Sequence, residues 1–341
     1  MPKSTNSVIL KHVVPIGDTV TLDAFKISES ELPQLADGQV LLRPIAFSVD
    51  PVQRTRITGK SHFALLASNV PGQPINGFAL ARVVESRHPE FKAGQLLEGM
   101  FDWSDYVIWD GKPSPFVRSV ELQIAKPSYA LSVLGITGLT AYFGIVEVGK
   151  LQKGETIVIS TAAGAVGSVA GAIAKIKGAK VIGLTSSRAK QDVLIQKLGF
   201  DAALNYRTDD FVEQLSAATS GKLDVYFDCV GGELSQTIMK QMKRPARIVE
   251  CGQISTYNDE KYAWMTNLTP IHLNGLRLEG YTPMLFKDKW PEALDQLQKW
   301  IRSGELVPLE TEMVGLESLP RALVALLSGE NVGKMLVTIK E

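Results

Sequence analysis

Residues 160–190 read STAAGAVGSVAGAIAKIKGAKVIGLTSSRAK, and this stretch decides the fold class. The apolar run TIVIS leads into it, a turn with two glycines follows, and Val169, Ala170 and Ile173 then recur at helical spacing. A second apolar run, AKVIGLT at 179–185, comes after the helix. A strand, a turn, a helix and a further strand at this distance predict a strand–helix–strand unit of a parallel sheet.

The glycine turn resembles the fingerprint of a dinucleotide site. Glycines there allow a tight bend, a close approach of backbone to pyrophosphate, and close packing of helix on strand, while the helix N-terminus offers free N–H groups. Ala162 replaces the first glycine of the fingerprint. The predicted pyrophosphate turn consists of Ala163, Gly164, Ala165, Val166 and Gly167. The alternative is an ordinary turn whose small residues only allow packing.

The end of the second strand favours NADPH over NADH. An NAD site has an Asp or Glu there that binds the ribose hydroxyls, and this chain has none. It has Ser186, Ser187, Arg188 and Lys190 instead, which offer hydroxyls and two cations to a 2′-phosphate. The alternative is that the two cations belong to an ordinary solvated helix start.

The chain as a whole predicts an α/β fold with two domains. Its 341 residues suffice for two cores. Up to about Lys126, short β-branched runs between Gly, Pro and Asp predict a partly open β-barrel. Strands and helices then alternate, which predicts a doubly wound parallel sheet, and the tail at 330–341 returns to strand composition and is expected to rejoin the barrel. The predicted strands are 155–160, 179–185, 201–206, 223–230, 246–252 and 276–281, the predicted domains 1–125 with 306–341 and 126–305.

The composition limits the kinds of partner and the kinds of site that we expect. Lysine plus arginine and aspartate plus glutamate both number 36, so no basic field favours nucleic acid or anionic lipid. No apolar run is long enough for a signal peptide or a membrane span, and we expect a cytoplasmic protein. The two cysteines and four scattered histidines show no ligand spacing, so no metal site is predicted.

Several motifs in order make the chain resemble a known family. The glycine turn, GLTAYFG at 138–144, CGQISTYN at 251–258 and ENVGKMLV at 330–337 are similar to zinc-independent medium-chain dehydrogenases/reductases. Within that superfamily the chain resembles the leukotriene/prostaglandin reductases, plant double-bond reductases and curcumin reductase-like enzymes. The resemblance implies a GroES-like substrate domain split around a Rossmann domain, NADPH as cofactor, and a homodimer paired through the last Rossmann strand.

The resemblance also implies roles for residues. Ser186 and Lys190 would bind the adenosine phosphate and Tyr206 would lie on the adenosine side. Thr140, Cys251 and Asn331 would line the nicotinamide half, and Cys229 occupies a cofactor-contacting position where the family has an asparagine. Tyr257 would lie near the substrate carbonyl.

Other positions depart from the family or from its zinc-dependent branch. Val52 replaces an aromatic residue and removes a hydroxyl from the substrate pocket, and GITGLTAY at 135–142 replaces the family's GMPGLTAY. The positions of the zinc ligands hold FSVDP and GFALARVV, which offer no ligand set. Alkene reduction without a metal is therefore favoured over alcohol oxidation, because an alkoxide needs a stabilising group.

The predicted reaction is hydride transfer from NADPH to the β-carbon of an α,β-unsaturated aldehyde or ketone. Tyr257 and the nicotinamide ribose would hold the carbonyl, and Tyr257 or water would protonate the α-carbon. The alternative for Tyr257 is a loop tyrosine that only packs its ring. Two other functions stay open at this point: an NADPH quinone reductase, and a non-catalytic NADPH-binding sensor or structural protein.

Overall fold

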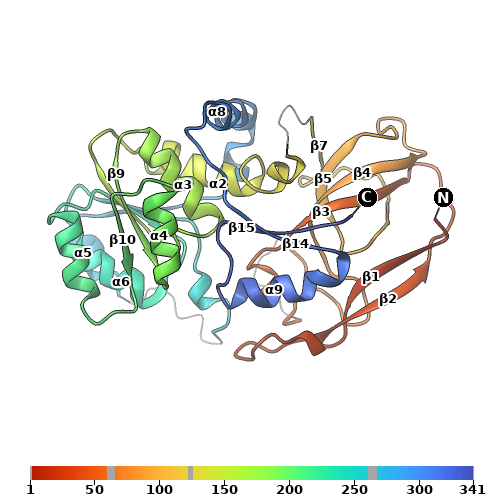
Figure 1. The fold of residues 1–341 in the computed structure, drawn as a ribbon, viewed down its shortest axis with the longest axis horizontal. Helices are drawn as coiled ribbons and strands as arrows, with labels where there is room; N and C mark the ends of the chain where they lie inside the picture. The colour runs from red at the N-terminus through yellow and green to blue at the C-terminus, as the bar shows by residue number, and fades with distance from the viewer. Residues whose placement is uncertain (1, 60–65, 122–125, 260–266, 341) are drawn as a thin grey trace. The chain divides into compact units, whose positions relative to one another are not determined.

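The computed structural model describes residues 2–59, 66–121, 126–259 and 267–340 (Figure 1). These residues form two compact units: 1–131 with 310–341, and 132–309. One unit contains a parallel sheet with helices and the other contains mainly antiparallel strands, so the predicted α/β class is confirmed. The predicted domain borders, after residues 125 and 305, stay a prediction.

The second unit is built on a six-stranded parallel sheet in the order β10-β9-β8-β11-β12-β13. Counted within the unit, this is the order 3-2-1-4-5-6 of a doubly wound dinucleotide-binding fold. The six strands lie within the six stretches that the sequence predicts. They are β8 (Thr156–Ile159), β9 (Lys180–Thr185), β10 (Ala202–Asn205), β11 (Val225–Asp228), β12 (Arg247–Glu250) and β13 (Arg277–Gly280).

The burial of these strands explains their sequences. β8 and β11 are buried along their whole length, and they read TIVI and VYFD. Both faces of a parallel sheet are covered by helices, so its central strands are continuous apolar runs. β13 lies at the edge and is mostly exposed, which is why its sequence RLEG carries charges.

Helices connect the strands of this unit (Figure 1). Helical spacing of apolar residues in the sequence predicts helices at 211–221, 233–244 and 289–306. The structure has α5, α6 and α8 at these stretches, and α8 buries Ala293 and Leu297. The helical elements are α2 (Ile136–Phe143), the π-helical turn η3 (Gly144–Val148), α3 (Ala165–Ile176), α4 (Arg188–Gln196), α5 (Phe211–Thr219), α6 (Gly232–Gln241), η4 (Ile254–Thr256), α7 (Thr269–Leu273), η5 (Pro283–Lys289) and α8 (Trp290–Ser303).

The first unit holds a seven-stranded sheet in which β14-β15-β3-β4-β5-β7 are neighbours and β6 pairs with β3, and also the hairpin β1-β2. β15 pairs antiparallel with β3, so the tail of the chain rejoins the β region as predicted. The strands are β1 (Ser4–Leu10), β2 (Phe25–Glu31), β3 (Val40–Ser48), β4 (Asn76–Ser86), β5 (Leu96–Asp102), β6 (Val107–Trp109), β7 (Arg118–Ser119), β14 (Glu310–Val314) and β15 (Lys334–Thr338). The helical elements are η1 (Leu22–Ala24), α1 (Gln53–Arg56), η2 (Pro127–Leu131), η6 (Leu316–Ser318) and α9 (Leu319–Leu327).

Two buried arginines in α1, Arg54 and Arg56, bind several backbone carbonyls of this unit. The guanidinium of Arg56 donates to the carbonyl of Asn76 at 2.7 Å, to the Asn76 side-chain oxygen at 2.6 Å and to the carbonyl of Ala67 at 2.9 Å. Arg54 donates to the carbonyls of Val14 and Asp18. Burial lowers the pKa of both guanidinium groups. We call Arg54, Arg56 and Asn76 the arginine corner.

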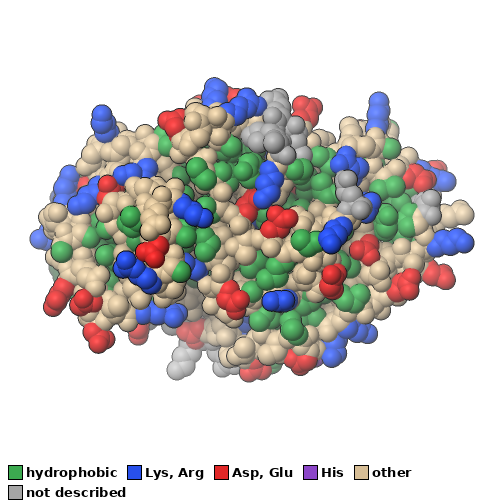
Figure 2. Space-filling view, viewed as in Figure 1, with side chains coloured by type: hydrophobic (Ala, Val, Ile, Leu, Met, Phe, Trp, Pro, Cys, Tyr) green, Lys and Arg blue, Asp and Glu red, His purple; other side chains and the backbone are tan. Residues whose placement is uncertain are grey.

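Positively and negatively charged side chains are mixed on the face of the molecule that Figure 2 shows. On the face shown in Figure 2, lysine and arginine side chains alternate with aspartate and glutamate side chains, and hydrophobic atoms lie between them. No helix among the described residues combines the length and the apolar character that crossing a membrane requires.

Candidate functional site

The glycine turn lies directly after β8, where α3 begins. Gly164 donates its N–H to the carbonyl of Thr161 at 2.8 Å, and Ser168 makes the first intrahelical bond, to the carbonyl of Gly164 at 3.0 Å. The N–H groups of Ala165, Val166 and Gly167 come before that bond, so the helix leaves them available. Together with the helix dipole they form a site suited to an anion.

Gly167 is required by its surroundings. A Cβ atom on this residue would lie 2.4 Å from the carbonyl oxygen of Thr161 and 2.9 Å from the Cα of Ala162. Thr161 itself has a positive φ of 49°, and Ala163 is buried. The backbone of the turn is thus pressed against the helix, which keeps side chains away from the N–H groups. The geometry suits a pyrophosphate.

The next strand end carries the residues predicted to bind a 2′-phosphate. Ser187 caps α4, accepting a hydrogen bond from the backbone N–H of Lys190 at 3.4 Å. The side chain of Arg188 is 85% exposed and its Nε lies 3.2 Å from a carboxylate oxygen of Asp192. Lys190 is half-buried, and burial lowers its pKa. Because Lys190 is half-buried beside the end of β9 whereas Arg188 is exposed to solvent, Lys190 is the stronger of the two candidates for a phosphate.

Tyr206 follows β10, the strand beside β9. Its backbone N–H donates to the carbonyl of Thr185 at 3.3 Å, so it lies at the same edge of the sheet as Ser186. The guanidinium of Arg207 lies 5.8 Å from the centre of the Tyr206 ring. The sheet therefore brings together the residues that the family resemblance assigns to the adenosine side.

On the other side of β8, a network of hydrogen bonds holds the end of β11. Asp228 is fully buried and accepts from the hydroxyl of Tyr226 at 2.9 Å and from the N–H groups of Val230 and Gly231 at 2.9 and 3.0 Å. A Ser235 hydroxyl also donates to it. The backbone after β11 is therefore held firmly, and this backbone carries Cys229.

Cys229 and Cys251 lie side by side at this edge. Asp228 and Glu250 are partners in the register of β11 and β12, and each cysteine is the next residue. The N–H of Cys251 donates to the carbonyl of Asp228 at 2.8 Å, and that of Cys229 to the Ser160 hydroxyl at 2.7 Å. Both cysteines lie in apolar runs of the sequence, which predicts small buried thiols. Both are instead partly exposed, because they follow the strand ends.

Thr140 reaches the same edge through Tyr281, which the sequence analysis did not single out. The hydroxyl of Tyr281 donates to the carbonyl of Thr140 at 2.5 Å, and a Cβ on Gly144 would lie 2.2 Å from that hydroxyl oxygen. Burial, then Cys251 and Cys229, raise the pKa of Tyr281 well above its ordinary value. The available signal was its position as the last residue of the last predicted strand, 276–281.

Tyr257 follows the short helix η4 and is half-buried. Its hydroxyl lies 3.6 Å from the position that a Cβ of Gly252 would take, so the ring folds back toward the end of β12. Gly252 follows Cys251 directly. The structure therefore brings the Tyr257 hydroxyl back to the beginning of the CGQISTYN motif, next to the residue that follows Cys251.

The sequence did not point to two further polar residues at this edge, Glu250 and Gln253. Burial, followed by the charge of Asp228, raises the pKa of Glu250 to about 7. The amide of Gln253 opposes that shift, yet neither its nitrogen nor its oxygen has a partner at hydrogen-bond distance within the part of the chain that is described. Gln253 is 7% exposed. The sequence contained no sign of this environment, because Glu250 is one polar residue within the predicted strand 246–252 and Gln253 is an ordinary polar residue after it.

Asn331 belongs to the other unit and is described with it. It is 7% exposed, and its side-chain N–H donates to the carbonyl of Gly333 at 2.7 Å. This bond orients the amide at the start of β15. Its predicted contact with a cofactor stays a prediction.

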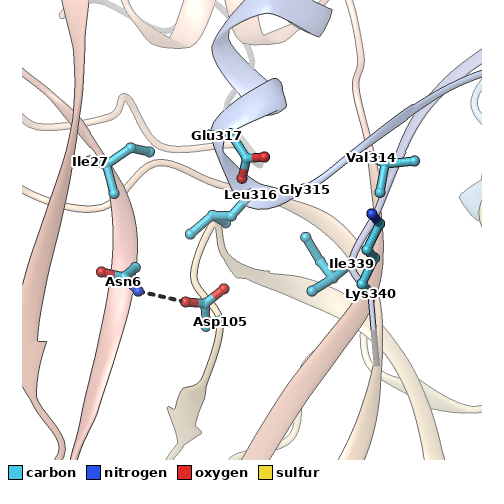
Figure 3. A pocket seen from close by; sticks show the side chains of 9 residues that line it. All are labelled: Asn6, Ile27, Asp105, Val314, Gly315, Leu316, Glu317, Ile339 and Lys340. Carbon is cyan, nitrogen blue, oxygen red and sulfur yellow. Dashed lines mark hydrogen bonds between the residues drawn. The ribbon is translucent and has the colours of Figure 1, made fainter.

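A hollow of about 410 Å³ lies within the first unit (Figure 3). Figure 3 shows Asn6 and Asp105 side by side in its lining, with Ile27, Leu316 and Ile339 also around the hollow. A hydrogen bond of 3.0 Å joins Asn6 to Asp105. None of the predicted site residues lines it. We therefore assign it no part in the candidate site.

Comparisons with known proteins identify the family. Two family models match the chain: the N-terminal domain of oxidoreductase at residues 9–117, and zinc-binding dehydrogenase at residues 165–299. The chain is 37% identical to an NADP(+)-dependent 2-alkenal reductase of Nicotiana tabacum, with 98% of each covered. The chain is a medium-chain dehydrogenase/reductase. Within that superfamily it belongs with the prostaglandin and 2-alkenal reductases.

Two further matches span the length of this medium-chain dehydrogenase/reductase. It is 37% identical to prostaglandin reductase 1 of Oryctolagus cuniculus, covering 98% of the chain and 93% of that protein. The crystal structure of CurA from Vibrio vulnificus in complex with NADPH superposes with a TM-score of 0.89 at 30% identity, covering 98% of this chain and 99% of the other.

One of the family models is described as zinc-binding, so the residues were compared with a zinc site. Zinc needs three or four Cys, His or carboxylate ligands. Across residues 2–59, 66–121, 126–259 and 267–340, no group of three or more such residues could hold a metal ion. The donor set of this medium-chain dehydrogenase/reductase, where it is described, does not fit zinc.

Proposed function

We propose that this protein reduces the activated C=C bond of α,β-unsaturated aldehydes or ketones with NADPH. The observation that carries the proposal is the full-length similarity to a reductase named for 2-alkenals, at 37% identity over 98% of both chains. The carboxyl edge of the parallel sheet supports it, because it offers an anion-binding turn, a lysine and several polar groups around β11 and β12.

The cofactor is NADPH, and two regions of this edge would hold it. The N–H groups of Ala165, Val166 and Gly167 suit the pyrophosphate. Lys190, with Ser186 and Ser187, suits the 2′-phosphate, and Tyr206 lies beside them. The strand order of the sheet changes direction between β8 and β11. Beyond that point, Thr140, Cys229 and Cys251 suit the nicotinamide half. Asn331 is a proposed contribution of the first unit.

When bound, NADPH supplies a hydride to the β-carbon of the substrate. Negative charge then develops on the carbonyl oxygen, and a hydroxyl donor aimed at that oxygen stabilises it by about 3 kcal/mol. We assign this donor to Tyr257. Tyr257 or water then protonates the α-carbon, which completes the saturated product.

Tyr257→Phe tests the proposal. Turnover of a 2-alkenal should fall about 100-fold while NADPH affinity stays within about twofold, because a transition-state hydrogen bond is lost and the cofactor contacts remain. Stopped-flow NADPH absorbance and fluorescence titration measure the two quantities. Unchanged turnover would remove Tyr257 from the mechanism.

A substrate panel tests the reaction class with the wild-type chain. Consumption of NADPH with 2-alkenals and enones supports the proposal. Consumption with quinones alone would make the protein a quinone reductase, and NADPH binding without consumption of any acceptor would make it a cofactor-binding sensor or structural protein.

We also propose a cytoplasmic homodimer in which β13 pairs with its copy. Among the described residues, β13 has a neighbouring strand on one side only, and edge strands are templates for pairing. Leu273 and Leu285, in the helices before and after it, are 71% and 70% exposed. Sedimentation of the wild type against a variant with proline in place of Leu278 tests this, and a wild-type monomer would contradict it.

A further inference from the structure

The sheet register places two thiols at bonding range. Cys229 and Cys251 each follow one member of the paired residues Asp228 and Glu250, and a backbone hydrogen bond of 2.8 Å joins Cys251 to Asp228. Neighbouring strands lie about 4.8 Å apart, whereas disulfides form between Cα atoms about 4.4–6.8 Å apart. The backbone therefore needs no large movement to bring the two sulfurs together.

The two side chains also share a face of the sheet. Side chains two residues apart in a strand point the same way, so Cys229 follows Phe227 and Cys251 follows Val249. A Cβ on Gly144 would contact Phe227, and one on Gly149 would contact Val249; both glycines border η3. The cysteines thus continue the η3-facing side of the sheet.

The thiols interact with each other. A hydrogen bond with Cys251 is the largest cause that raises the pKa of Cys229 well above its ordinary value, followed by burial. The hydroxyl of Tyr281 also interacts with both sulfurs. Contact between the sulfurs is therefore supported by the side chains as well as by the backbone.

We propose that Cys229 and Cys251 form a modification site at which a peroxide converts the two thiols into an intramolecular disulfide. Because the pKa of Cys229 is raised, Cys251 is the attacking group. Its thiol loses a proton, the sulfur attacks a peroxide oxygen and becomes a sulfenic acid, and the O–O bond breaks so that the departing oxygen takes up that proton and leaves as water. The second thiol then displaces the sulfenic oxygen as a second water, and the S–S bond forms. The protein loses two protons and two electrons, and hydrogen peroxide is reduced to two waters.

The disulfide should be readily reversible. A bond between directly neighbouring strands departs from relaxed disulfide geometry, and strained disulfides are more easily reduced. The consequence for activity rests on the proposed function, in which both cysteines line the nicotinamide half. Joining them should lower turnover, and dithiothreitol should restore it.

Intact-mass spectrometry tests the chemistry without reference to activity. The chain has only two cysteines, so each outcome has a distinct mass. After hydrogen peroxide treatment of the full-length protein, we expect a loss of two hydrogen masses per chain, a fall from two titratable thiols to none, and reversal by dithiothreitol. Oxygen additions without that loss, covalently linked dimers, or two unchanged thiols would overturn the proposal.

Phenylarsine oxide tests the same proximity without oxidation. A trivalent arsenical bridges two adjacent thiols and releases water, so the reduced wild type should bind one molecule per chain. The Cys229→Ser and Cys251→Ser variants should release it about 100-fold faster, because about 2.7 kcal/mol of binding free energy would be lost. Equal release from wild type and variants would contradict the inference. Failure of the proposed function is distinct, because it would appear as no NADPH consumption by the reduced wild type.

Discussion

The arginine corner in the first unit and the carboxyl edge of the sheet in the second unit both bury polar groups, yet they treat them differently. In the corner, Arg56 donates to four oxygens of its own unit. At the edge, Gln253 has no hydrogen-bond partner among the residues described, and Glu250 has a raised pKa. Since an unsatisfied buried group costs stability, the comparison separates polar groups that hold the fold from groups that cost it stability.

The largest expected effect tests the structural side of this comparison. Arg56→Met should lower the free energy of unfolding by about 3 kcal/mol, because buried carbonyl oxygens would lose their donor. Arg43→Met, which removes a single bond to the carbonyl of Lys340, should change it by less than about 0.5 kcal/mol. Urea unfolding followed by tryptophan fluorescence measures both. Equal effects would show that the corner has no special structural role.

The second test concerns the glycine turn at the edge. Gly167→Ala should lower the free energy of unfolding by about 2 kcal/mol, because the new methyl group would press on the Thr161 carbonyl. NADPH affinity should also fall about tenfold, since the turn must shift. Gly252→Ala is the matched control for stability: its Cβ would have ordinary contact at 3.6 Å. A Gly167→Ala protein as stable as the control would refute the tight packing.

The third test separates the two cations after β9. Lys190→Gln should weaken NADPH binding about tenfold, or about 1.4 kcal/mol, and leave NADH binding unchanged, because only NADPH carries the 2′-phosphate. Arg188→Gln should have a smaller effect, about threefold, because Asp192 already binds that side chain. Calorimetric titration measures the affinities, with Lys197→Gln at the other end of α4 as control. Equal loss of NADH binding would refute a phosphate contact.

The smallest expected effect concerns Glu250. Its pKa of about 7 in the folded protein exceeds that of an unfolded glutamate, about 4.3, so the folded state holds a proton that the unfolded state releases between these values. The free energy of unfolding should therefore fall as the pH rises from about 4.3 to 7 and level off above. Glu250→Gln should remove this slope and stabilise the protein at pH 8 by about 1 kcal/mol, allowing for partial hydration of the carboxylate.

The measurement for Glu250 is thermal unfolding across this pH range. Glu213→Gln, on the exposed side of α5, serves as the control and should keep the wild-type slope. Retention of the slope in Glu250→Gln would mean that another group titrates.

Local pattern predicted much of this fold. All six strands of the parallel sheet lie where β-branched and apolar runs predict them, because central parallel strands are buried on both faces. The turn at 164–167 was predicted as well, since its glycines are required by contacts within a single strand–turn–helix unit. The roles of Tyr257 and Lys190 remain predictions, because no ligand contact tests them.

The sequence by itself determined the class of the fold, the order of its elements, the family and the glycine turn between β8 and α3, because each depends on neighbours in the chain. Only the tertiary structure decided that Cys229 and Cys251 follow paired residues of neighbouring strands, that Tyr281 bonds to Thr140, and that Glu250 shares its surroundings with Asp228. These contacts join residues from 22 to 141 positions apart. Such pairs depend on strand order and on the alternation of faces, which no local pattern of residues contains.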